Sequence, residues 1–86
     1  MKLHLTAKVP NEGARLVAQW IMGLPGGLID ARVQLDTEED RVQRIVDGEM
    51  VPGMAVGQRL ATRAGVRARD FHRAPTGGWF DRPAEA

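Results

Sequence analysis

Apolar and polar positions follow a two-residue period at the start of the chain and a helical period further on. Over residues 2–9, every second residue is Leu, Ala or Val, which predicts a half-buried β-strand ending at Pro10. Asn11 can cap a following helix with its side chain, and apolar residues at helical spacing continue to Met22. The glycine-rich stretch 23–27 ends this predicted helix.

Residues 28–36 carry two competing patterns. The odd-numbered residues from 29 to 35 are apolar and alternate with polar ones, which is typical of a strand. Leu28, Ala31 and Leu35 are also spaced three and four residues apart, which suits a short helix. We favour the helix because the resemblance described below requires it, and a strand remains the alternative.

Two further helices are indicated downstream. The first begins near Asp36 or Thr37, carries acids in its first turn at 38–40 and ends at Gly48. The second opens near Pro52, carries an apolar stripe and ends at Gly65. A short turn around 68–71 would follow, with the ring of Phe71 as an anchor in the core.

The order and spacing of these signals resemble the second half of a lambda-repressor/Cro-type helix-turn-helix domain. Residues 42–71 match well and residues 14–35 match loosely. The resemblance implies a mostly α fold of about five short helices, in which the helix 36–47 lies in the DNA major groove. An α+β fold with strands 2–9 and 28–35 in one sheet is the alternative. The matching residues are Val42, Arg44, Ile45, Gly48, Pro52, Leu60, Ala61, Gly65, Val66 and Phe71, with Leu16, Trp20, Gly23 and Leu24 upstream.

The resemblance also implies which residues contact DNA. Arg44 would read guanine, Arg41 would reach a phosphate, and backbone N–H groups near Val51 would approach phosphates too. Three features depart from the family pattern: Arg32 stands in place of a small apolar residue, Asp36 in place of the turn glycine, and acids occupy 38–40. The complete set of implied DNA contacts is Glu39, Asp40, Arg41, Gln43, Arg44 and Val51.

Composition limits the remaining possibilities. The 86 residues, 43% of them hydrophobic, suffice for one domain over 1–73 followed by a flexible tail over 74–86. Residues 1–50 carry six basic and eight acidic side chains, whereas 51–86 carry six and three, so DNA binding would rest on a local patch. The absence of cysteine and of long apolar runs predicts a cytoplasmic protein without a membrane partner.

No cofactor, metal site or enzymatic activity is expected. The chain has no cysteine, serine or tyrosine, and its two histidines are far apart, so nucleophile–base pairs and metal clusters lack their usual residues.

We therefore expect a phage or mobile-element transcription regulator, such as a repressor. It would bind a palindromic DNA operator as a homodimer, with residues 1–9 pairing between copies. The alternative is a small phage-type module, an inhibitor or adaptor, that binds a host protein through its acidic patch. The Arg face with Trp79 and Phe80 is the other surface such a module could use.

Overall fold

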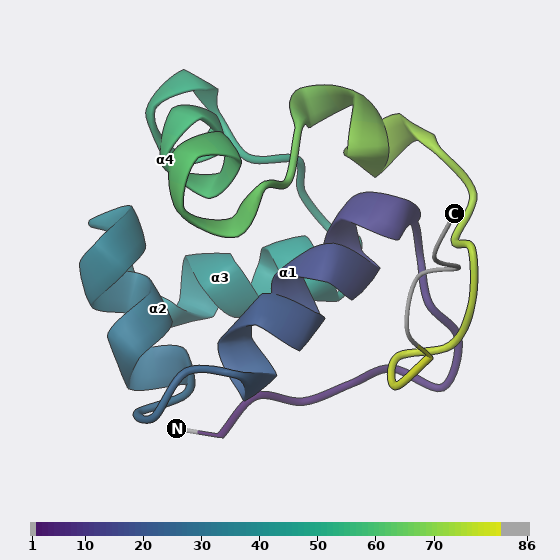
Figure 1. Ribbon diagram of the computed structural model, residues 1–86, viewed down its shortest axis with the longest axis horizontal. Helices are drawn as coiled ribbons and strands as arrows, with labels where there is room; N and C mark the ends of the chain where they lie inside the picture. Colours follow the sequence, from purple (N-terminus) through teal and green to yellow (C-terminus); the bar gives the residue numbers. More distant parts are fainter. Residues whose placement is uncertain (1, 82–86) are drawn as a thin grey trace.

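Helices make up the fold over residues 2–81, the part of the chain that the computed structural model describes. In Figure 1, α1 crosses the middle of the molecule, with α2 and α4 on one side and η1 and the C-terminal segment on the other. The predicted mostly α fold is confirmed. Residues 28–35 are helical, so the alternative with a strand at this position is wrong. The elements are α1 (Glu12–Met22), α2 (Leu28–Leu35), α3 (Glu39–Val46), α4 (Met54–Ala64) and the 3-10 helix η1 (Ala68–His72).

The N-terminal segment is extended, but the predicted strand does not form in the described chain. The His4 N–H donates to Gln43 Oε1 at 2.8 Å, and Gln43 Nε2 donates to the His4 carbonyl at 2.8 Å. One side-chain amide thus takes the place of a neighbouring strand. The alternation still identifies the inward side chains, since Leu3, Leu5 and Val9 pack against the core.

The helices begin and end where local chemistry allows. Asn11 caps α1, its Oδ1 accepting from the Ala14 N–H at 2.7 Å. Gly48 and Gly65 follow α3 and α4 with φ of 78° and 70°, a left-handed conformation that glycine adopts at little cost. These stops lie at the positions that the sequence predicted.

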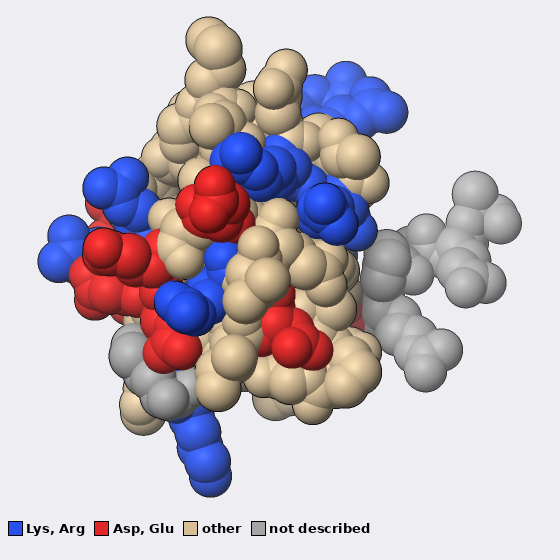
Figure 2. Space-filling view, turned by 90° about the vertical axis from the view of Figure 1, so that its left-hand side faces the viewer, with Lys and Arg blue, Asp and Glu red and all other residues tan. Residues whose placement is uncertain are grey.

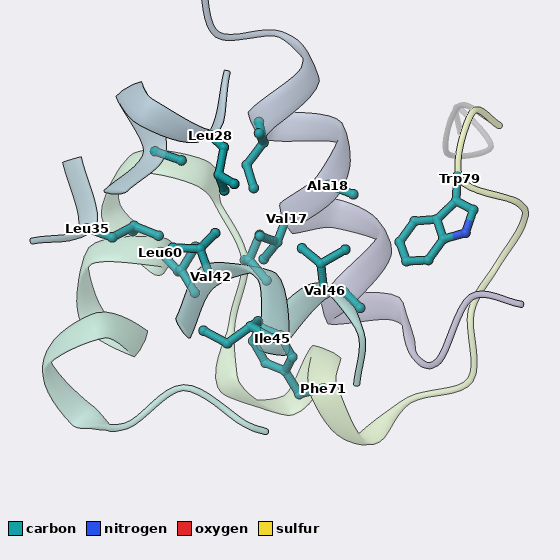
Figure 3. Packing of buried hydrophobic residues seen from close by; sticks show 14 residues of the cluster. Val17, Ala18, Leu28, Leu35, Val42, Ile45, Val46, Leu60, Phe71 and Trp79 are labelled. Atoms are coloured by element: carbon teal, nitrogen blue, oxygen red, sulfur yellow. The ribbon is translucent and has the colours of Figure 1, made fainter. Parts of the chain in front are cut away.

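One apolar core joins the four α-helices. Figure 3 shows Leu35, Val42 and Leu60 grouped at one end, Ile45 beside Phe71, and Trp79 at the opposite end. The buried hydrophobic residues are Ala14, Val17, Ala18, Ile21, Leu28, Ala31, Leu35, Val42, Ile45, Val46, Leu60, Val66, Phe71 and Trp79.

Residues 74–81 pack along α1, where a flexible tail was expected. Trp79 is only 7% exposed, and its Nε1 donates to the Thr6 carbonyl at 2.7 Å. Gln19 Nε2 donates to the carbonyls of Trp79 and Asp81. The indole therefore fastens the two terminal segments to each other, while Gln19 fastens the later one to α1; residues 82–86 lie outside the described residues.

Candidate nucleic-acid interface

Helices α2 and α3 form a helix–turn–helix unit with a three-residue connection. Asp36 has φ 50° and ψ 52°, the left-handed conformation that aspartate tolerates better than most residues. The N–H groups of Asp36 and Thr37 donate to the carbonyls of Val33 and Arg32, which closes α2 before the chain turns. Asp36 thus adopts the conformation that the resemblance assigns to a glycine.

The two helices meet along an apolar seam. Ala31 and Leu35 of α2 and Val42 and Ile45 of α3 are all at most 1% exposed. Because these side chains are buried in the shared core (Figure 3), they fix the rotation of α3 about its axis. The opposite face of α3 is consequently held toward solvent.

That outward face carries both signs of charge. Asp40, Arg41 and Arg44 are exposed, while Glu39 is half-buried. Arg44 Nε lies 3.1 Å from Asp40 Oδ2, with 58% and 64% of the two side chains exposed. An exposed i,i+4 pair of this kind is worth only about 0.3–0.5 kcal/mol, so Arg44 can exchange it for another partner.

Gln43 does not belong to the outward face. It is 7% exposed, and besides bonding His4 its Nε2 donates to Asp47 Oδ1 at 2.8 Å. Its amide is thus committed to holding the N-terminal segment on α3. The contact between Gln43 and DNA that the resemblance implies gains no support from this placement, because the amide already bonds the N-terminal segment.

The other implied residues lie around the unit. Val51 is 48% exposed in the connection between α3 and α4. Arg32 is exposed on α2, so it does not occupy the packed position that the resemblance gives to a small residue. Asp36 Oδ2 lies 3.8 Å from the Arg59 guanidinium, which joins the turn to α4. No local pattern along the chain indicates this pair, because only tertiary packing brings α4 beside the turn.

Charges of both signs are interleaved across α2, α3 and α4. Figure 2 shows acidic side chains placed between basic ones on this face, without a continuous basic surface. The basic residues of these three helices include Arg32, Arg41, Arg44, Arg59 and Arg63, and the acidic residues of α3 and the turn before it include Asp36, Glu38, Glu39 and Asp40. On such a face the opposite charges offset each other, so it produces only a weak electrostatic field at long range.

Within residues 2–81, no three His, Asp or Glu side chains are placed to hold a metal ion. No helix in this range has the length and apolar character needed to cross a membrane. Comparisons with protein-family models, curated proteins and solved structures gave no match.

Proposed function

We propose that this chain is a sequence-specific DNA-binding regulator of the Cro/repressor type, acting as a dimer with α3 in the major groove. The observation that carries the proposal is the α2–turn–α3 unit, with its left-handed Asp36 and its buried seam. Such a unit holds a short helix by one face and leaves the other free to enter a groove. Two copies would read half-sites about one helical turn apart.

Arg44 is the main base-reading residue in this proposal. Its exposed pair with Asp40 is weak, whereas a bidentate contact with guanine contributes about 1–3 kcal/mol of discrimination. The guanine contact therefore outweighs the ion pair. Asp40 and Glu39 would accept from cytosine N4, and Arg41 would contact a phosphate.

The acids at 38–40 lower non-specific affinity. Carboxylates at the start of α3 repel phosphates, while the five arginines of α2, α3 and α4 attract them. We therefore expect weak binding to random DNA and a larger ratio of specific to non-specific affinity than a uniformly basic surface would give.

The test is selection from a random double-stranded DNA library, followed by gel-shift titration with the enriched sequence. Arg44→Ala should cost about 1–3 kcal/mol and relax preference at one base pair. Arg69→Ala, which removes an exposed arginine from η1, is the matched control and should leave that preference intact. Failure to enrich any sequence, or binding that does not weaken with salt, would contradict the proposal.

A protein-binding module is the second candidate, and one observation favours it. Ile29 and Val33 on α2 are 54% and 67% exposed, one turn apart on its outward side. Exposed aliphatic pairs are commoner at protein interfaces than on DNA-binding faces. Trp79 is buried, so Phe80 is the exposed aromatic residue left beside the arginines of the surface that this alternative uses. Val33→Glu would abolish partner binding under this candidate and spare recognition of bases by Arg44 under the first.

A further inference from the structure

Helix α4 carries two arginines that are neighbours on its surface. Arg59 and Arg63 are four residues apart in the helix, a spacing that brings side chains next to each other. The side chain of Arg59 is 39% exposed, and Arg63 is exposed as well. Because like charges at this spacing repel each other, an anion between the two guanidinium groups would be attracted by both and would relieve the repulsion.

One carboxylate of the protein already lies near this pair of arginines. Asp36 Oδ2 is 3.8 Å from Arg59 Nη2, and 84% of the Asp36 side chain is exposed. Within the described chain, no carboxylate pairs with Arg63. Two positive charges thus share one negative charge, through an exposed pair of a kind that contributes little energy. The two arginines therefore keep a capacity for a further anion.

A shallow hollow in the surface of α4 surrounds the two arginines. It has a volume of about 510 Å³, and its lining residues are Ala55, Gln58, Arg59, Ala61, Thr62 and Arg63. The exposed side-chain amide of Gln58 supplies further N–H donors, while the small alanine side chains leave the space open. The Thr62 hydroxyl donates to the Gln58 carbonyl at 3.0 Å. The hollow thus presents cationic and amide donors and contains no acidic side chain.

We infer that Arg59 and Arg63 form a binding site for a phosphate group, with the Gln58 amide donating a further hydrogen bond. Guanidinium groups match the oxygens of a phosphate in geometry, and charge strengthens each of these hydrogen bonds. The hollow is larger than the ion itself, so it can also admit the sugar to which a backbone phosphate is attached.

The position of the site favours a phosphate of the DNA backbone. Through Asp36, Arg59 is joined to the turn that precedes α3, the helix proposed to enter the major groove. A strand bordering that groove would pass this side of the molecule, and phosphate contacts there would fix the register of α3. The inference thus rests on the proposed function and deepens it. The site requires no particular base sequence, so it can be tested apart from base reading.

Asp36 would compete with the phosphate for Arg59. Both anions would use the same guanidinium group, so the aspartate lowers the affinity of the site. Asparagine, like aspartate, tolerates the left-handed conformation that residue 36 adopts. Asp36→Asn therefore removes the competing charge and keeps the turn.

The salt dependence of binding to a random DNA duplex at low salt tests the site. Each neutralised backbone phosphate adds about 0.9 to the slope of log K against log salt concentration. Arg59→Gln/Arg63→Gln should therefore lower this slope by about 0.9. The matched control is Arg69→Gln/Arg73→Gln, which should keep the slope. These two exposed arginines are also four residues apart, and Arg73 likewise pairs with an aspartate, Asp70, at 3.6 Å.

The two double variants separate the inference from the proposed function. Equal slopes for both would exclude a DNA phosphate at this site. If the base preference that depends on Arg44 persists in that case, the proposed function stands without the site. If the chain binds no DNA at all, the proposed function fails, and titration with pyrophosphate alone decides on the site.

A double-mutant cycle on the same duplex tests the competition. Asp36→Asn should tighten binding, and this gain should disappear in the Arg59→Gln background. Glu38→Gln removes an equal charge from an exposed residue nearby, and its gain should be the same in both backgrounds. A gain from Asp36→Asn that does not depend on Arg59 would contradict the shared guanidinium group.

Pyrophosphate distinguishes a free phosphate compound from a DNA phosphate. In an NMR titration at constant ionic strength, the Nε–H signals of Arg59 and Arg63 should shift first. Those of the two control arginines should follow only at higher concentration. Such a shift combined with equal duplex slopes would keep the site and assign it to a free phosphate compound. Equal slopes together with no preferential shift would overturn the inference.

Discussion

Arg15 is a charged side chain with no exposure to water. Its Nε and Nη2 donate to both carboxylate oxygens of Glu12 at 2.9 and 2.7 Å, and it also donates to Thr76 Oγ1 and the Asp81 carbonyl. Burial of an ion pair is tolerated only when the remaining polar groups are also satisfied. The Thr76 N–H, which donates to Glu12 at 2.8 Å, completes that requirement.

Removing one partner of this pair should be far more costly than removing an exposed one. Arg15→Met leaves the Glu12 carboxylate buried without its cation, which should lower the free energy of unfolding by about 3–5 kcal/mol. Urea unfolding followed by circular dichroism measures the loss. Arg44→Met, which breaks the exposed pair with Asp40, is the control and should change stability by less than about 1 kcal/mol. Equal losses would show that the buried pair is not the stabilising one.

The same cluster makes stability depend on pH in the acid range. The hydrogen bond from Arg15, together with bonds from Thr76, outweighs burial and lowers the pKa of Glu12 from 4.5 to about 2. Because the folded pKa is the lower one, this stabilisation is complete above pH 4.5 and is lost as pH falls toward 2. We expect Glu12→Gln to be less stable than the parent at pH 6, and the gap to close by pH 2. If urea titrations at these pH values give a constant difference in stability between Glu12→Gln and the parent, the lowered pKa of Glu12 is contradicted.

Helices α1 and α4 differ in the space that they leave for a side chain at their glycines. A Cβ at Gly13 of α1 would overlap the ring of Phe71, whereas a Cβ at Gly57 of α4 would meet nothing within 4 Å. Alanine is favoured over glycine inside a helix by about 0.8–1.0 kcal/mol, and that gain is the same at both sites. Any difference in stability between the two alanine substitutions must therefore come from packing.

Gly13→Ala and Gly57→Ala should consequently shift stability in opposite directions. Gly57→Ala should raise the free energy of unfolding by about 0.5–1 kcal/mol. Gly13→Ala should lower it by about 1–3 kcal/mol, since overpacking exceeds the gain in propensity. Thermal unfolding of both variants at one low protein concentration would measure this. Stabilisation by Gly13→Ala would mean that Phe71 does not pack on α1 as described.

Helical elements were predictable where the signal is local. The Asn11 cap, the glycines at 48 and 65, and the apolar spacing within each helix depend on neighbours in sequence. The N-terminal segment was not predictable in this way: a strand was expected, but the backbone of His4 bonds to the side-chain amide of Gln43, 39 residues away. Periodicity reports which side of a segment is buried, but not what satisfies its backbone.

In the candidate site, too, the features that depend on local sequence were predictable and those that depend on distant segments were not. The seam residues Val42 and Ile45 followed from helical spacing, and their burial orients α3. The burial of Gln43 and the Asp36–Arg59 pair depend on distant segments, so no local pattern along the chain indicates either. Roles in binding DNA rest on the resemblance and await the selection experiment.

The molecule as a whole is closed by its two terminal segments. Trp79 fills the end of the core farthest from Leu35 and Leu60 (Figure 3), and its indole N–H bonds to Thr6. Segments 2–10 and 74–81, far apart in sequence, are therefore held together on one side of α1. The stable unit extends past residue 73, where the sequence placed the end of the domain.

Substitutions at the adjacent aromatic residues 79 and 80 should differ in their effect on stability, because residue 79 closes the fold and residue 80 lies on the surface. Trp79→Ala removes a buried ring and its hydrogen bond and should cost about 3–5 kcal/mol, because the cavity opens between both terminal segments and α1. Phe80 is 77% exposed, so Phe80→Ala should change stability by less than about 0.5 kcal/mol. Urea unfolding gives the stabilities, and amide hydrogen exchange at His4, whose N–H donates to Gln43, shows whether the N-terminal segment is released in Trp79→Ala. Protection that survives Trp79→Ala would mean that Gln43 alone holds the N-terminal segment, and that residues 74–81 cover α1 without closing the fold.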